Sequence, residues 1–319
     1  MSALIYRPLR TGEFHLFHRY SNPPTSGVGA RTRTFDEFVA DGDYRPGWTW
    51  VAQRGDDIVA RAAFFGPPDA VHPYSLDWFD PGVGPYRIET GAALLRAAYT
   101  ALAPPDYWAP PHPDGGRPDY HLFLPADWRD RPDAHADVTD RMTAAEEAGL
   151  NHFVERVNVR WTPDHGLPAR STRLQFVVPD DAQVVDVLDR MCVDTLDAYA
   201  QRDVERHGRR RAAELTLDEL ADMPGGRDWW RLALDPTGAK VGFVAPTRMS
   251  HSATIGYLGV VPEQRGHHYS DDLLVEALHL FSDAGEQVVN DATDVGNAPM
   301  VASFARVGYE VTGRRVVMT

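Results

Sequence analysis

A short segment in the last half of the chain combines residue types that suit the binding of phosphate groups. An apolar run ends at Val260-Val261-Pro262, and the stretch 271–281 that follows has the apolar periodicity of a helix. The first amides of a helix have no partner inside it, and the helix dipole adds partial positive charge there. The spacing predicts a cradle of backbone amides for a diphosphate, at Gly266, His268 and Ser270.

A second motif follows this segment. The chain reads NAPMVASFARVGY over residues 297–309. The two motifs, in this order, resemble those of the GNAT N-acetyltransferase superfamily. The first family motif is a strand, Val-x-Pro, Arg-Gly-x-Gly-x-Gly/Ala and a helix. The second is Asn, a small or apolar residue three positions on, an aromatic residue four further, and Gly-Phe or Gly-Tyr. The resemblance covers residues 172–319.

The resemblance implies that the cradle holds the diphosphate of coenzyme A, with acetyl-CoA or another acyl-CoA as cosubstrate. It also implies that the pantetheine arm lies between two strands, pairing with the backbone near Leu258 and Val260. Asn297 is similar to the family's asparagine on the pantetheine side, and Phe304 would pack at the thioester end. The residues assigned to the cofactor in this way are Leu258, Val260, Val261, Arg265, Gly266, His267, His268, Tyr269, Ser270, Asn297, Met300 and Phe304.

The chain departs from the family pattern at three of these positions. His268 and Ser270 replace glycines of the loop, and a Cβ at residue 268 narrows the approach of a phosphate to the backbone. Phe304 stands where many family members carry a tyrosine that protonates the leaving thiolate, which phenylalanine cannot do. Another group, or water, must then supply that proton.

Three residues are candidates for the catalytic chemistry of amine acylation, which needs a base for the ammonium group. Asp291 and Asp294 follow the apolar run before Asn297, and either one could be the base or could hold the amine. The alternative is that Asp294 caps the next helix and Asp291 lies on a solvated rim. Tyr257 could contact the acceptor or simply pack in the core.

The elements that must position these residues repeat along the chain. Each half shows an apolar run, an amphipathic helix, a tryptophan-led hairpin, a strand, a helix, and a last helix closed by a glycine, Gly149 or Gly308. We therefore predict two tandem α/β (α+β) units: a degenerate GNAT-like domain over 1–161, a linker over 162–171 and the GNAT N-acetyltransferase domain over 172–319. The resemblance implies a mixed, mostly antiparallel sheet flanked by helices in each.

The first unit departs further from the family pattern. In its corresponding loop, 80–92, Pro85 removes an amide donor and Glu89 would repel phosphate. Its second motif lacks the asparagine. We expect this unit to bind the cofactor poorly and to serve structure or acceptor selection.

Composition narrows the possible partners. The formal net charge of the 319-residue chain is −14, which argues against nucleic acid and anionic membranes and favours a small, cationic amine. Cys192 is the single cysteine, so no intrachain disulfide forms, and His267 and His268 have no third ligand at a suitable spacing, so no metal site is expected. No signal peptide or membrane span is recognisable, and we expect a cytoplasmic monomer or homodimer.

The sequence thus predicts an acetyl-CoA-dependent N-acetyltransferase whose second unit moves an acyl group to a primary amine by direct attack. The alternative hypothesis is a catalytically weak tandem GNAT fold that binds a ligand or partner. His268, Phe304 and the degenerate first unit motivate this alternative.

Overall fold

The computed structural model describes residues 3–20, 27–29, 31, 33–103, 117–249 and 252–319. Its chain divides into two compact units. Unit 1 comprises residues 1–155 together with 313–319, and unit 2 comprises residues 156–312. This division differs from the sequence prediction, which ended the first domain at residue 161 and kept the C-terminal residues with the second.

Unit 1 is built around a mixed, mostly antiparallel sheet with strand order β1-β2-β3-β4-β5-β12. Its helices pack on that sheet through two clusters of buried apolar side chains. The elements within the first 151 residues are β1 (Leu4–Pro8), α1 (Phe14–Phe17), α2 (Phe35–Ala40), β2 (Thr49–Arg54), β3 (Asp57–Phe65), β4 (Ser75–Asp80), α3 (Arg87–Leu102), β5 (Asp119–Leu124) and α4 (Pro132–Glu147).

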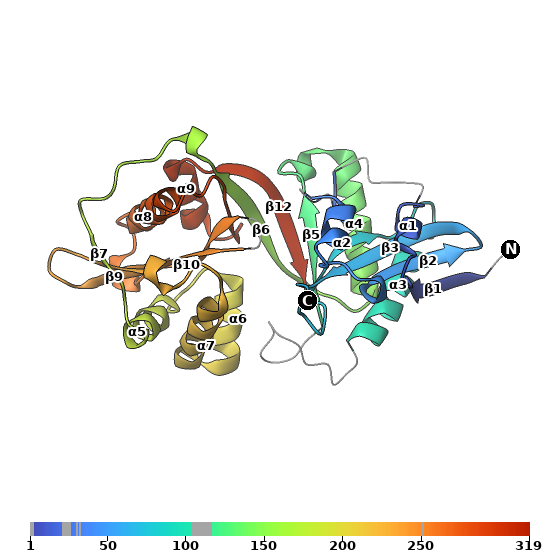
Figure 1. Ribbon diagram of the computed structural model, residues 1–319, viewed down its shortest axis with the longest axis horizontal. Helices are drawn as coiled ribbons and strands as arrows, with labels where there is room; N and C mark the ends of the chain where they lie inside the picture. The colour runs from blue at the N-terminus through green and yellow to red at the C-terminus, as the bar shows by residue number, and fades with distance from the viewer. Residues whose placement is uncertain (1–2, 21–26, 30, 32, 104–116, 250–251) are drawn as a thin grey trace. The chain divides into compact units, whose positions relative to one another are not determined.

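Unit 2 has the same plan, with strand order β6-β11-β10-β9-β8-β7. Helices α8 and α9 lie on one side of β9 and β10, and α5, α6 and α7 lie on the other (Figure 1). The elements are β6 (His152–Trp161), β7 (Gln175–Val177), α5 (Asp181–Met191), α6 (Ala198–His207), α7 (Arg209–Asp222), β8 (Arg231–Leu234), β9 (Lys240–Arg248), β10 (Ala253–Val260), α8 (Tyr269–Asp283), β11 (Val289–Asp294), α9 (Ala298–Val307) and β12 (Glu310–Met318). The predicted mixed architecture is confirmed.

The strand that ends each half of the sequence joins the sheet formed mainly by the other half. Strand β6 follows α4 of unit 1, yet its residues 156–161 pair antiparallel with β11. Strand β12 follows α9 of unit 2, and its residues 314–318 pair antiparallel with β5. Such pairing joins residues far apart in sequence, and neither local propensity nor apolar periodicity encodes it.

Two features of β10 open unit 2 for a ligand. Strand β10 is parallel to β11, but the two pair only at Ala253 and Val289, so they separate beyond that point. A β-bulge at Gly256 interrupts the pairing of β10 with β9. Because of the bulge, Gly256 and Tyr257 both face α5 and α7. A Cβ on Gly256 would collide with Leu220 there. The strands thus form a V that is closed at Ala253.

Both repeat-ending helices finish in the same way. In α9, the amide of Gly308 bonds the carbonyl of Ala305, and the amide of Tyr309 bonds the carbonyl of Phe304. This pair of hydrogen bonds is the Schellman motif, and it needs the left-handed conformation that Gly308 adopts (φ +99°). Gly149 (φ +93°) ends α4 with the same two bonds. Both glycines were predicted as helix-ending residues.

Among the residues that the structure describes, none of the helices is long and apolar enough to cross a membrane.

Candidate active site

A pocket of about 560 Å³ lies in unit 2, where β10 and β11 separate. Most of the residues that the sequence assigned to the cofactor or to catalysis line it. These are Tyr257, Leu258, Val260, Arg265, Gly266, His268, Tyr269, Ser270, Asp291, Asn297, Met300 and Phe304.

The loop between β10 and α8 presents unpartnered backbone amides. Gly266 (φ +85°) and His268 (φ +58°) both adopt left-handed conformations, and His268 is the N-cap of α8. In the described chain, no hydrogen bond uses the amides of residues 266–270. Consecutive amides at a helix N-terminus, with a left-handed residue among them, form a concave anion site. The unpartnered amides thus lie in the loop where the sequence predicts a cradle.

Side chains beneath the loop fix its position. The guanidinium of Arg265 donates to the carbonyls of Val260 (3.2 Å) and Met191 (3.0 Å) and so ties the loop to the end of α5. The Ser270 hydroxyl lies 2.6 Å from the buried Ser303 hydroxyl, joining α8 to α9. Arg265 was predicted to bind the cofactor, and its carbonyl contacts give it a structural role.

A network next to the cradle adds a cation to the pocket wall. Arg306 of α9 donates to both carboxylate oxygens of Asp271 (2.7 and 2.8 Å) and to the Ser303 hydroxyl (3.1 Å). Arg306 also lines the pocket. Arg306 belongs to the second motif but was not among the predicted site residues.

Asp291 lies at the closed end of the V and bridges the two separating strands. Its Oδ1 accepts hydrogen bonds from the Ile255 amide (2.7 Å) and the Thr254 hydroxyl (3.0 Å), both on β10. Its side chain is buried, with the residue 8% exposed, and not on a solvated rim. Burial raises the pKa of Asp291 to about 6, although the Ile255, Thr254 and Tyr309 groups partly oppose this shift. A carboxylate that titrates near neutrality and faces a pocket suits a general base.

Tyr257 lines the pocket from the other side of β10. Burial raises the pKa of the Tyr257 hydroxyl well above its ordinary value, and the neighbouring Cys192 thiol adds to that effect. The hydroxyl therefore stays protonated at neutral pH. It can donate a hydrogen bond, but it cannot accept a proton as a base.

Asp294 does not line the pocket, although it was predicted as a catalytic candidate. Its Oδ2 accepts from the Ala198 amide (2.7 Å) at the start of α6, and its Oδ1 lies 3.3 Å from Arg156. The alternative that Asp294 caps α9 is not observed either. Asn297 caps that helix by accepting from the Met300 amide (3.3 Å). Asp294 thus anchors α6 to β11.

Two further predicted residues lie off the pocket. Val261 is fully buried in the apolar cluster beneath α5 and α7, because alternation along the strand turns its side chain away from Val260. The side chain of His267 is exposed, and its carbonyl accepts from Arg173 (3.1 Å). The backbone amide of His267 remains available in the cradle.

The segment between α5 and α6 forms the remaining wall of the pocket, and none of its residues was predicted as a site residue. Asp194, which has a left-handed backbone (φ +50°), and Asp197, the N-cap of α6, both line the pocket with Arg156. The left-handed Asp194 has no motif that would reveal it in a sequence. In the part of the chain that the structure covers, no three His, Cys, Asp or Glu residues gather as a metal site.

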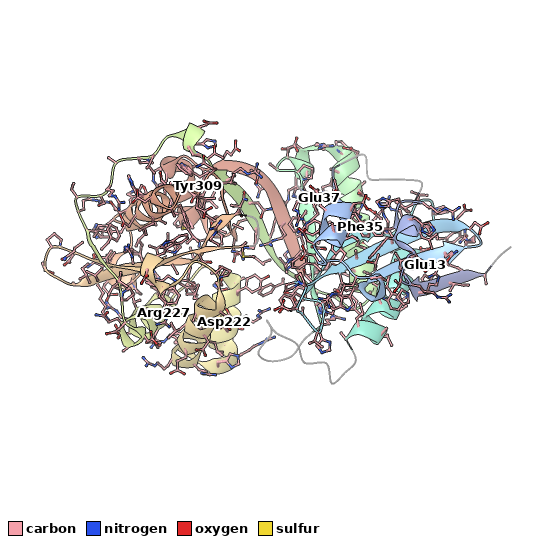
Figure 2. All side chains as sticks on the ribbon, viewed as in Figure 1. Glu13, Phe35, Glu37, Asp222, Arg227 and Tyr309 are labelled. Carbon is pink, nitrogen blue, oxygen red and sulfur yellow. The ribbon has the colours of Figure 1, made fainter. Side chains whose placement is uncertain are left out.

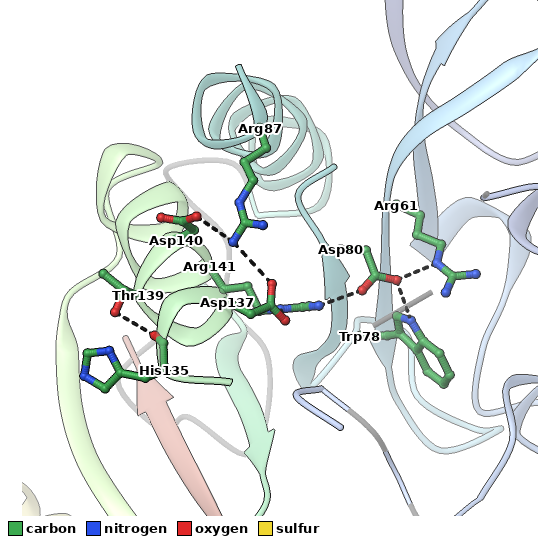
Figure 3. A network of polar contacts seen from close by, with 9 residues as sticks. All are labelled: Arg61, Trp78, Asp80, Arg87, His135, Asp137, Thr139, Asp140 and Arg141. Atoms are coloured by element: carbon green, nitrogen blue, oxygen red, sulfur yellow. Dashed lines mark hydrogen bonds and ion pairs between the residues drawn. The ribbon is translucent and has the colours of Figure 1, made fainter. Parts of the chain in front are cut away.

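The corresponding region of unit 1 is filled by buried charges (Figure 3). Asp80, at the end of β4, accepts from Arg61 (2.6 Å) and Arg141 (2.9 Å) and is 1% exposed. Burial alone would raise the pKa of Asp80, but the guanidinium groups of Arg141 and Arg61 outweigh it and hold that pKa below its ordinary value. Arg141 also contacts Asp137 (3.1 Å).

Comparison with known proteins adds evidence on the fold. No protein-family model and no curated protein matches the chain. A GCN5-related N-acetyltransferase from Sphaerobacter thermophilus is similar in structure, with a TM-score of 0.56, 16% identity, and coverage of 99% of this chain and 94% of that one. The GCN5-related glucosamine N-acetyltransferase region of a fungal multi-domain GH3 β-N-acetylglucosaminidase has a TM-score of 0.51 and 14% identity, covering 100% of this chain and 38% of that one.

A tandem GNAT protein from the clavulanic acid biosynthesis pathway has 18% identity and a TM-score of 0.49, covering 99% of this chain and 98% of that one. The fold that the sequence resemblance implied is confirmed by the first two structures. The chain has the fold of the GCN5-related N-acetyltransferases along its length.

Proposed function

We propose that unit 2 is an acyl-CoA-dependent N-acyltransferase, most simply an acetyltransferase, that acts on a primary amine. The observation that carries this proposal is the pocket between β10 and β11, which begins at a buried carboxylate and is walled by a loop of unpartnered amides. Fold similarity alone would not support an activity, because one fold hosts many functions.

The residues present suit coenzyme A. The amides of residues 266–270 would hold the diphosphate, with Arg265 as a neighbouring cation, whereas the charge of Arg306 is balanced by Asp271. The edge of β10 at Leu258 and Val260 would pair with the pantetheine arm, because β11 has separated from it there. When bound, an acyl-CoA supplies an activated thioester.

We further propose transfer by direct attack in a ternary complex, without a covalent enzyme intermediate. Asp291 accepts a proton from the ammonium group, directly or through water, because it is ionised above about pH 6 and faces the pocket. The neutral amine can then attack the thioester carbonyl, so that a C–N bond forms and the C–S bond breaks. The second proton that the amine nitrogen loses passes through water to the leaving thiolate, since Phe304 carries no acidic group.

The acceptor that fits this pocket is a cationic amine. Asp194 and Asp197 line the side formed by the segment between α5 and α6, and the chain carries a formal net charge of −14. Carboxylates at the rim attract an ammonium group, whereas the cradle repels it through its partial positive charge. The two substrates would thus be sorted to different sides of the pocket.

Calorimetric titration with acetyl-CoA tests the proposal, followed by free-thiol release with a panel of amines. We expect one binding site per chain and thiol release that depends on the amine. Absence of detectable binding would overturn the proposal.

A binding-only module is the second candidate, and two observations favour it. Phe304 provides no acid, and His268 places a Cβ in the cradle at a left-handed backbone position. This candidate predicts acetyl-CoA binding without turnover. Amine-dependent thiol release that is lost in Asp291→Asn would rule it out.

A further inference from the structure

Tyr309 is held next to the pocket by the end of α9. It follows Gly308 directly, and its amide bonds the carbonyl of Phe304 (2.9 Å) in the Schellman motif. The ring centroids of Tyr309 and Phe304 lie 4.8 Å apart at an interplanar angle of 65°. An apolar contact between these two positions commonly accompanies the motif. The backbone and the ring contact thus fix where the Tyr309 hydroxyl points (Tyr309 is labelled in Figure 2).

That hydroxyl interacts with the Asp291 carboxylate. Burial raises the pKa of Tyr309 well above its ordinary value, and the charge of Asp291 raises it further. In return, the Tyr309 hydroxyl lowers the pKa of Asp291. Tyr309 is 6% exposed, so its hydroxyl has little access to bulk water.

The two groups also share unmet hydrogen-bonding capacity. Oδ1 of Asp291 has two donors on β10, but Oδ2 and the Tyr309 hydroxyl are both buried and have no hydrogen-bond partner within the described chain. An orphaned buried donor beside an orphaned buried acceptor is costly unless the two pair. A hydrogen bond between the two groups would satisfy both.

We propose that Tyr309 is a positioning residue for acyl transfer, holding Oδ2 of Asp291 so that the carboxylate faces the pocket in its ionised form. This inference rests on the proposed function, in which Asp291 is the base. The phenol itself does not exchange protons with substrate, because its interaction is with Asp291.

Among the described residues whose groups act on the pKa of Asp291, Tyr309 is the one with an ionisable side chain. Strand β10 contributes the Ile255 amide and the Thr254 hydroxyl. Phe304 of α9 is apolar and lines the same pocket. On β6, Val159 is the register partner of Asp291.

The charged groups of β6 and β11 are engaged elsewhere. Arg156 contacts Asp294, and Arg160 donates to Asn290 (3.0 Å). No charged side chain acts on the pKa of Asp291 in the described structure. Removing the Tyr309 hydroxyl therefore changes a single interaction.

The test is the pH dependence of kcat/KM in Tyr309→Phe, which keeps the ring contact with Phe304. A donor to the charged form lowers a pKa, so its loss shifts the acidic limb upward by about one pH unit. Activity below the limb falls about tenfold, while activity well above it is nearly unchanged. A loss that is equal at every pH would overturn the proposal, because it would indicate a structural role only.

Tyr44→Phe is the matched control. Tyr44 in unit 1 is also buried and donates to a buried carboxylate, Asp77 (2.8 Å). We expect its substitution to leave the pH profile unchanged. A shift as large as that of Tyr309→Phe would overturn the proposal, because the effect would then not be local to Asp291.

Direct titration of Asp291 by carbon-13 NMR of labelled aspartate carboxyls separates this inference from the proposed function. Asp291→Asn assigns the signal. If no acyl transfer is found but the pKa of Asp291 still rises in Tyr309→Phe, the proposed function fails and the Tyr309–Asp291 pair stands. If the pKa of Asp291 is the same in both proteins, the inference fails whatever the activity.

Discussion

The last helices of the two units, α4 and α9, end with the same backbone conformation but have different side chains at corresponding positions. Both end in a Schellman motif, at Gly149 and at Gly308. Eight residues before the glycine, unit 1 has Arg141 and unit 2 has Met300. The guanidinium of Arg141 is buried against Asp80, whereas Met300 lines the pocket.

Other positions around the closing glycine also have different residues in the two units. Four residues before the glycine, unit 1 has Ala145 where unit 2 has Phe304, and directly after it Leu150 replaces Tyr309. In unit 1 the β4 bulge residue is Asp77, held by Arg31 (2.7 Å), whereas Gly256 occupies the bulge of β10. Both parallel strand pairs separate after one or two pairs. Strand separation alone therefore does not make a site, because buried ion pairs can fill it.

The largest expected effect comes from Asp291→Asn. We expect kcat/KM to fall by about 10²–10⁴, the usual contribution of a general base. In the wild type, kcat/KM should rise with pH through about 6 as Asp291 loses its proton. Asp77→Asn in unit 1 is the control, and an equal loss of activity there would break the distinction between the units.

Asp80→Asn tests the buried network of unit 1. It leaves Arg61 and Arg141 without their shared carboxylate, so we expect the free energy of unfolding to fall by about 3–5 kcal/mol. Because the pKa of Asp80 is lowered in the folded state, its contribution is present above pH about 4 and is lost as pH falls through that lowered pKa. Urea unfolding at pH 7 and pH 3 measures both. A difference that persists undiminished at low pH would contradict the ionic explanation.

Met300→Arg introduces into unit 2 the arginine that unit 1 has at the corresponding position, Arg141. The new guanidinium has no buried carboxylate equivalent to Asp80 at hand, and it occupies pocket volume, so we expect acetyl-CoA affinity to fall about tenfold or more. Met300→Leu should bind almost as the wild type does, because an apolar swap of similar volume is tolerated. Calorimetry on both variants, with unfolding midpoints to confirm folding, decides the matter.

The smallest expected effect comes from His268→Gly. A left-handed backbone costs a non-glycine residue about 1 kcal/mol, so the variant should be more stable by up to that amount and bind acetyl-CoA severalfold more tightly. Gly266→Ala is the opposite test, since it puts a Cβ at φ +85° and should weaken binding. Weaker binding by His268→Gly would mean that the imidazole itself contacts the cofactor.

The repeated plan and the cradle could be predicted from sequence because their determinants are local. Glycines that end helices, and a loop leading from a strand into a helix, are written in consecutive residues, as at Gly308 and Gly266. The exchange of β6 and β12 could not be predicted, because strand pairing depends on residues far apart.

The individual side chains of the site were less predictable. Val261 faces the core while its neighbour Val260 faces the pocket, and only the register of β10 decides which. Asp294 and Asp291 are close in sequence, yet Asp294 anchors α6 to β11 and Asp291 lies at the closed end of the V. Tyr309 stands in the Gly-Tyr pair of the second motif, but no spacing reveals that its hydroxyl lowers the pKa of Asp291.

Hydrogen–deuterium exchange with and without acetyl-CoA tests most directly the claim that unit 2, and not unit 1, holds the cofactor. The amides of residues 266–270 are unpartnered in the structure, so binding should slow their exchange, while peptides covering residues 81–91 of unit 1 should be unchanged. Protection of residues 81–91 to the same extent, or no protection of residues 266–270, would contradict the account.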